Sequence, residues 1–194
     1  MLKLRMSKTE KIELLVSWLT ISVAFSILFG REFLNVGSFA VMLPISLLVV
    51  GTGFILHELS HKYVALHFGA WAEYRAWNIG LIIALASSFL GFIFAAPGAV
   101  YISGNISKKQ NGIISVAGPI TNIAIGLIFL AVAVIAKTGS LFHTIAFLGF
   151  KINFFLALFN MIPIFPLDGS KVFAWDNKIW ALVFFPALAV VLLA

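Results

Sequence analysis

Long apolar segments separated by short polar ones dominate the pattern of this chain. Their lengths and the residues that interrupt them predict five helices, at about 12–30, 39–67, 112–136, 140–160 and 179–194. A helix needs about 20 apolar residues to cross a hydrocarbon core of about 30 Å, and several segments reach that length. The pattern therefore predicts an all-α polytopic membrane protein with about five to six transmembrane helices.

Residues 79–96 form the one ambiguous segment. It is long enough to cross, but two serines interrupt it and a Pro-Gly pair closes it. If it does not cross, ten of the thirteen Lys and Arg residues share one side, which the positive-inside rule assigns to the cytoplasm, with Arg31 and Lys137 opposite. We therefore expect a re-entrant or short β-hairpin segment near 79–102. Within it, residues 97–102 are either a strand that can pair with an extended peptide or a plain loop.

The composition supports a single membrane-embedded domain over residues 1–194. Hydrophobic residues make up 62% of the chain and charged residues 10%, and no linker, repeat or low-complexity stretch marks a second domain. The net charge of +6 does not indicate nucleic acid, because the basic residues lie at the ends of apolar segments. We expect the N-terminal basic and apolar stretch to be a retained anchor, since no small-x-small cleavage site follows it.

His57, Glu58 and His61 form an H-E-x-x-H motif near one end of the second predicted helix. The spacing of four puts both imidazoles on one helical face, where they can share a zinc ion, with Glu58 beside them to take a proton from zinc-bound water. Ionisable residues are costly inside a bilayer and usually mark function there. The alternative interpretation is a hydrogen-bonded polar cluster that joins helices.

A third metal ligand must come from another part of the chain, because a catalytic zinc site has three protein ligands and one open position. The chain has no cysteine, and its other acidic and histidine residues lie in extramembrane stretches or on the opposite side, which leaves Asp168. Pro163 and Pro166 break the preceding helix, and Gly169 permits a tight turn that bends the carboxylate toward the metal. A helix cap is the alternative role of Asp168. We expect one Zn²⁺ per chain.

Two amides at buried positions, Asn122 and Asn160, are candidates for hydrogen bonds to the substrate backbone or to the oxyanion. Hydrogen bonding between helices explains their positions equally well. Asn153, in the middle of a predicted helix, is interpreted as a packing residue, as are Gly118 and Gly126.

The two motifs together resemble the site-2 protease family of intramembrane metalloproteases. The resemblance rests on H-E-L-S-H at 57–61 and N-x-x-P-x-x-P-L-D-G at 160–169, and it runs from about Val41 to Lys171. It implies that the two histidines and the aspartate bind zinc, that the glutamate is the general base, and that the substrate is a membrane-spanning protein, as in regulated intramembrane proteolysis. A site toward the cytoplasm is typical of that family and agrees with the charge count.

Other functions fit a polar site in these helices less well. A transporter or metal channel also uses His and Asp within its spans, but it needs no general base between two ligands. Other membrane zinc peptidases take a glutamate from a later helix, and this chain has no Glu after Glu73. The sequence thus predicts a zinc metalloendopeptidase in the bilayer that hydrolyses peptide bonds within or near transmembrane segments, by zinc-activated water and a glutamate general base.

Overall fold

The computed structural model describes residues 5–30, 36–94 and 96–193. Arg31, which entered the predicted topology, and Ala194, the end of the last predicted helix, lie outside the described residues. The elements in chain order are α1 (Lys8–Gly30), α2 (Val36–His67), β1 (Trp71–Ala76), α3 (Asn78–Leu90), β2 (Gly98–Ser103), α4 (Lys108–Ile135), α5 (Leu141–Asn160), α6 (Asp168–Trp175) and α7 (Asn177–Leu193).

Four helices in the described part of the chain, α1, α2, α4 and α5, are long and apolar enough to cross a membrane. This supports a helical membrane protein, but the predicted count of five to six spans is not confirmed. The apolar helices α3 and α7 have 13 and 17 residues. At 1.5 Å per residue they extend about 20 and 25 Å, which is less than the roughly 30 Å of a hydrocarbon core.

The chain forms a two-stranded antiparallel sheet, with β1 between α2 and α3 in the sequence and β2 between α3 and α4. Of the strand and the plain loop left open for 97–102, the structure has the strand, β2, and it pairs with β1, a strand that the sequence analysis did not predict. The register sets Glu73 opposite Tyr101 and Arg75 opposite Ala99. The segment near 79–102 is therefore no simple hairpin, because the helix α3 separates the two paired strands.

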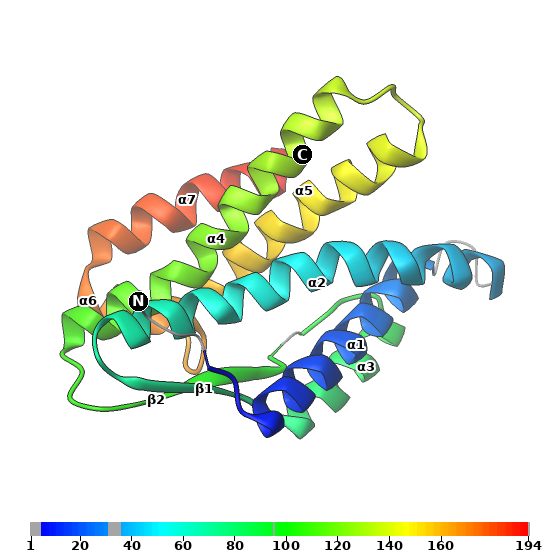
Figure 1. Ribbon diagram of the computed structural model, residues 1–194. Coiled ribbons are helices and arrows are strands. Elements are labelled where there is room, and N and C mark those ends of the chain that lie inside the picture. The colour runs from blue at the N-terminus through cyan, green and yellow to red at the C-terminus, as the bar shows by residue number, and fades with distance from the viewer. Residues whose placement is uncertain (1–4, 31–35, 95, 194) are drawn as a thin grey trace.

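Helix α2 runs between two groups of helices, with α1 and α3 on one side and α4, α5 and α7 on the other (Figure 1). The indole of Trp18 on α1 lies where a side chain at Gly51 of α2 would stand, and its Nε1 donates to the carbonyl of Leu47 over 2.9 Å. Glycines also let α4 and α5 approach each other, since Gly126 lies against Phe154. Small residues at such crossings are the usual basis of helix packing in membranes.

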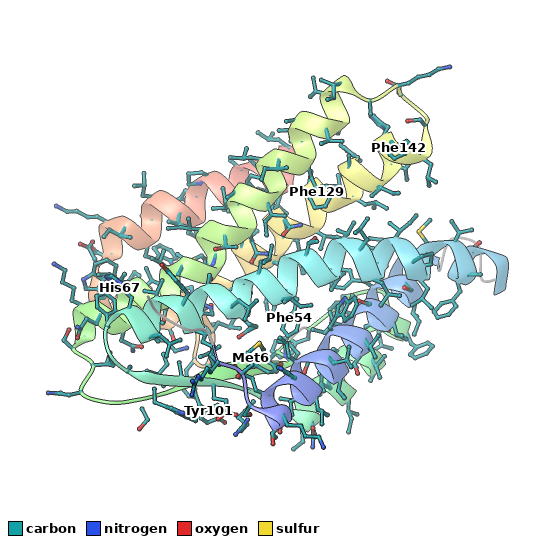
Figure 2. All side chains as sticks on the ribbon, viewed as in Figure 1. Met6, Phe54, His67, Tyr101, Phe129 and Phe142 are labelled. Atoms are coloured by element: carbon teal, nitrogen blue, oxygen red, sulfur yellow. The ribbon has the colours of Figure 1, made fainter. Side chains whose placement is uncertain are left out.

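The sheet lies beside the part of α2 that carries the H-E-x-x-H motif. Phe54 of α2 contacts Tyr74 of β1 edge to face, with ring centroids 5.8 Å apart, and both side chains are buried. Figure 2 shows Tyr101 at the sheet and Phe142 at the beginning of α5, at opposite edges of the molecule, and both side chains are exposed. The packed interior between these edges holds the site described next.

Candidate metal centre

His57 and His61 lie one helical turn apart on the buried face of α2. Their Nε2 atoms are 3.0 Å apart, and the two residues are only 4% and 6% exposed. The predicted juxtaposition of the two imidazoles on one helical face is thus present in the structure.

The amide of Asn122 on α4 fixes the tautomer of His57. Its Nδ2 donates to the carbonyl of Gly53 over 3.1 Å and to Oδ1 of Asn153 over 3.0 Å, so its Oδ1 faces His57. That oxygen lies 2.5 Å from Nδ1 of His57 and can only accept, which places the ring proton on Nδ1. The lone pair of His57 is therefore on Nε2.

His61 is oriented in the same way by the backbone of α4. Its Nδ1 lies 2.7 Å from the carbonyl oxygen of Ile114, and a carbonyl only accepts. The proton is again on Nδ1 and the lone pair on Nε2. A hydrogen bond from the ring nitrogen that does not face the metal is typical of histidines that bind metals.

Asp168 is the first residue of α6, where the chain has returned to the histidines. Its Oδ2 lies 3.2 Å from Nε2 of His57 and 3.1 Å from Nε2 of His61. Leu167 is the N-cap of α6, so the Asp168 carboxylate faces the histidines rather than capping the helix. Gly169 packs against the carbonyl of Met161, where an added Cβ would lie 2.1 Å from the oxygen. Only glycine permits this approach, as the turn argument from the sequence required.

The donor set fits a catalytic zinc ion. Two lone-pair nitrogens and one carboxylate oxygen converge within 3.0 to 3.2 Å of one another. A proton can satisfy one of these pairs at a time, whereas a divalent cation attracts all three atoms at once. A tetrahedral ion with bonds of roughly 2.0–2.1 Å holds its ligands roughly 3.3 Å apart, close to the distances present here.

Gly118 on α4 leaves the space that this arrangement needs. A Cβ at this position would lie 2.5 Å from Nε2 of His57 and 2.5 Å from Nε2 of His61. The interpretation of Gly118 as a packing residue is therefore incomplete, because its missing side chain also makes room for the rings of His57 and His61.

Glu58 lines the same cavity as the three ligands, a space of about 410 Å³. It is buried, and its Oε2 has no hydrogen-bond partner among the described residues. Buried polar atoms without a partner are rare and usually have a functional reason. A carboxylate oxygen in this position could accept a proton from a water molecule bound to a metal ion at these residues.

The two predicted substrate-binding amides also line this cavity, but their surroundings differ. The amide of Asn122 is bonded on both sides by protein groups. Asn160 donates from Nδ2 to the carbonyl of Leu156 on its own helix over 3.0 Å. The sequence analysis interpreted Asn153 as a packing residue but did not predict its contact with Asn122: its Oδ1 accepts from Asn122, and its Nδ2 donates to the carbonyl of Gly149 over 2.9 Å.

A second buried cluster lies between α1, α2 and β1. Nζ of Lys62 donates to the two carboxylate oxygens of Glu10 over 2.7 and 2.5 Å, and both residues are buried. Beside this pair, the hydroxyl of Ser7 donates to Glu73, and this bond lowers the pKa of Glu73 below its usual value, with Arg75 adding to the effect. Burial raises the pKa of Tyr74, which stays a neutral donor.

Comparisons with known proteins agree with a zinc site. "Putative zinc metalloprotease MJ0611" of Methanocaldococcus jannaschii is 44% identical over 191 residues, which are 97% of this chain and 95% of that protein. "Zinc metalloprotease MJ0392" of the same organism is 27% identical over 75% of this chain and 37% of that protein. "Putative zinc metalloprotease YwhC" of Bacillus subtilis is 25% identical over 68% of each chain. No family model and no solved structure matches the chain.

Proposed function

We propose that this chain, which belongs to the zinc metalloprotease family of its M. jannaschii relative, hydrolyses peptide bonds within or near the transmembrane segments of membrane proteins. The observation that carries the proposal is the place of the site in the fold. His57, Glu58 and His61 belong to α2, a helix that is long and apolar enough to span a bilayer. Their cavity is therefore within reach of a substrate that is itself embedded in the membrane, as in proteases of the site-2 type.

The catalytic step divides between a metal and a base. His57, His61 and Asp168 would hold a zinc ion, which would lower the pKa of a bound water molecule toward neutrality and polarise the scissile carbonyl. Glu58 accepts the proton that the water loses as it attacks, and it returns this proton to the departing amine. Asn160, at the wall of the cavity, is the residue that we assign to the substrate backbone or the oxyanion.

The substrate must reach this site in an extended form. The backbone hydrogen bonds of a transmembrane helix hide its carbonyl groups, so the helix has to unwind locally before attack. Residues 98–102 of β2 line the cavity and offer a strand edge to which an unwound segment can add. We propose that this strand addition holds the scissile bond near the metal.

We place the open end of the cavity toward the cytoplasm, because ten of the thirteen basic residues fall on that side in the predicted topology. The chain has no cysteine, so a single introduced thiol can report its own side of the membrane. A Lys108→Cys variant should react with a membrane-impermeant reagent from the cytoplasmic side only. Reaction from the outside alone would contradict the proposed orientation.

A matched pair of variants tests the proposed reaction. Glu58→Gln keeps the size of the side chain but removes the base, so zinc content should stay near one per chain. Cleavage of a membrane-spanning substrate should then fall by at least the roughly 10²- to 10⁴-fold typical of a lost general base. Asp168→Ala removes a ligand, so both zinc and cleavage should be lost.

The results of this pair can contradict the proposal in two ways. Full zinc content in Asp168→Ala would move the third ligand elsewhere. Native cleavage by a zinc-loaded Glu58→Gln protein would rule out the protease mechanism, and metal flux in liposomes would then test a transporter.

A further inference from the structure

The first turns of α1 cover one edge of the sheet. The backbone N–H of Tyr74 donates to Oε1 of Glu10 over 3.2 Å, and that of Ala76 donates to Oε2 of Glu13 over 2.9 Å. These N–H groups therefore point away from β2 and toward α1. Two carboxylates occupy the edge of β1 at which another strand would otherwise add.

The register then identifies the backbone groups on the opposite edge. Since Tyr74 and Ala76 face outward, the alternate residues Glu73 and Arg75 face β2, where they pair with Tyr101 and Ala99. On β2 the alternate residues Gly98, Val100 and Ile102 therefore turn their N–H and C=O groups away from β1. All three residues line the cavity of the metal site. Strand addition is thus directed to one edge only in the described sheet.

A buried ion pair ties this sheet to the metal site. Lys62 directly follows the ligand His61 on α2, and its Nζ donates to both oxygens of Glu10 and to the carbonyl of Arg5 over 3.0 Å. Glu10 in turn accepts from β1. One carboxylate therefore links the turn of α2 that holds a metal ligand to the strand that supports β2.

We propose that Glu10 and Lys62 are positioning residues. They fix where the open edge of β2 lies relative to the metal site. A strand added at Gly98, Val100 and Ile102 then presents one particular peptide bond to Glu58. This inference rests on the proposed function and adds to it the choice of the cleaved bond. A pair that only stabilised the fold would change the amount of active protein but not the bond that it cuts.

The main test replaces both partners together, because removing one would leave a buried charge unpaired. Glu10→Met with Lys62→Met should retain zinc, lose roughly 10- to 100-fold in kcat/KM through misplacement of the substrate, and cut at additional bonds. Zinc is measured by elemental analysis, and the cut bonds are identified by mass spectrometry of the products.

Lys11→Met is the control, since Lys11 is an exposed cation next to Glu10, and its replacement should leave the rate and the position of cleavage unchanged. A zinc-loaded double variant that cuts only the native bond at the native rate overturns the proposal.

A second variant decides the question if the double variant does not fold. Glu13→Ala removes the cap on Ala76 without leaving a buried cation unpaired, so it should bind zinc and still cut at additional bonds. Cleavage at the native bond alone would count against positioning of β1 by the carboxylates of α1, which is the contact through which Glu10 acts. A Val100→Cys variant with Glu58→Gln, cross-linked to cysteines placed along an uncleaved substrate, gives the alignment without hydrolysis. A native chain that cleaves nothing refutes the proposed protease. Cleavage by the native chain, together with an unchanged cut bond and an unchanged cross-linking alignment when Glu10 and Lys62 or Glu13 are replaced, refutes only the present inference.

Discussion

Two buried polar clusters lie on neighbouring faces of α2, and two consecutive residues of this helix belong to them, one to each cluster. His61 belongs to the candidate metal site, and Lys62 belongs to the pair with Glu10. The Lys62 cluster is complete, because an ammonium group has three donors and all three have acceptors in the described structure. In the metal site, three acceptor atoms converge and Oε2 of Glu58 has no partner among the described residues.

The difference separates a structural role from a chemical one. A completed pair holds elements together, and a change in it should appear in stability or alignment while the metal stays bound. Acceptor atoms without donors are explained by a cation that binds them. A mutation among these residues should therefore change the metal content. Residues one position apart on a helix are thus expected to respond to mutation in different ways.

The largest expected effect is at Gly118. An alanine Cβ would lie 2.5 Å from the Nε2 atoms of both histidines, so either the rings rotate or α4 moves away. Movement of α4 would also stretch the bonds that orient the two histidines, since Asn122 and Ile114 belong to that helix. We expect Gly118→Ala to bind almost no zinc while keeping its helical circular dichroism.

Gly126 is the matched control on the same helix. An alanine there meets the ring of Phe154 at 2.7 Å, so it also overpacks α4, but it touches no metal ligand. Gly126→Ala should lose stability by about 1–3 kcal/mol and keep its zinc. Equal zinc contents in the two variants would show that Gly118 is only a packing position.

An intermediate effect is expected at Asn122. Removal of its amide leaves His57 free to change tautomer and ring orientation, and loss of such support typically costs 10- to 100-fold in metal affinity. We therefore expect Asn122→Ala to bind zinc about 10- to 100-fold more weakly, as measured by competition with a chelator. Unchanged affinity, with impaired cleavage, would return Asn122 to the substrate-binding role that the sequence suggested.

The predictable part of the fold was the part with strong local signals. Long apolar segments gave helices whose ends agree with the structure to within a few residues, because length and breakers act locally. Strand β1 was missed because it has only six residues and its buried residues, Ala72, Glu73 and Tyr74, are consecutive and include a charge, so no apolar alternation marks it. The partner strand begins 22 residues after β1 ends, beyond the helix α3, so the pairing has no local signature.

The metal site followed a similar rule. Asp168 could be proposed because the chain has few candidate ligands, so elimination left one carboxylate on the correct side. The hydrogen bonds that orient His57 could not be predicted, because Asn122 and Asn153 lie on different helices and only the packing of these helices brings the two amides together. Glu10 and Lys62 are 52 residues apart and give no periodic signal, so the sequence alone does not predict that they form a pair.

The smallest effect is expected in the completed cluster, at Tyr74. Its hydroxyl donates to Oγ of Ser17 on α1 over 2.9 Å, and both residues are fully buried. Tyr74→Phe keeps the ring against Phe54 and removes one neutral hydrogen bond, which contributes about 0.5–1.5 kcal/mol. Thermal unfolding in detergent should therefore begin only a few degrees lower, by roughly 2–4 °C per kcal/mol. Zinc content should be unchanged, because no atom of this bond supports a metal ligand. Loss of zinc in Tyr74→Phe would mean that the two clusters on α2 form one coupled unit, and the division between a structural and a chemical cluster would then fail.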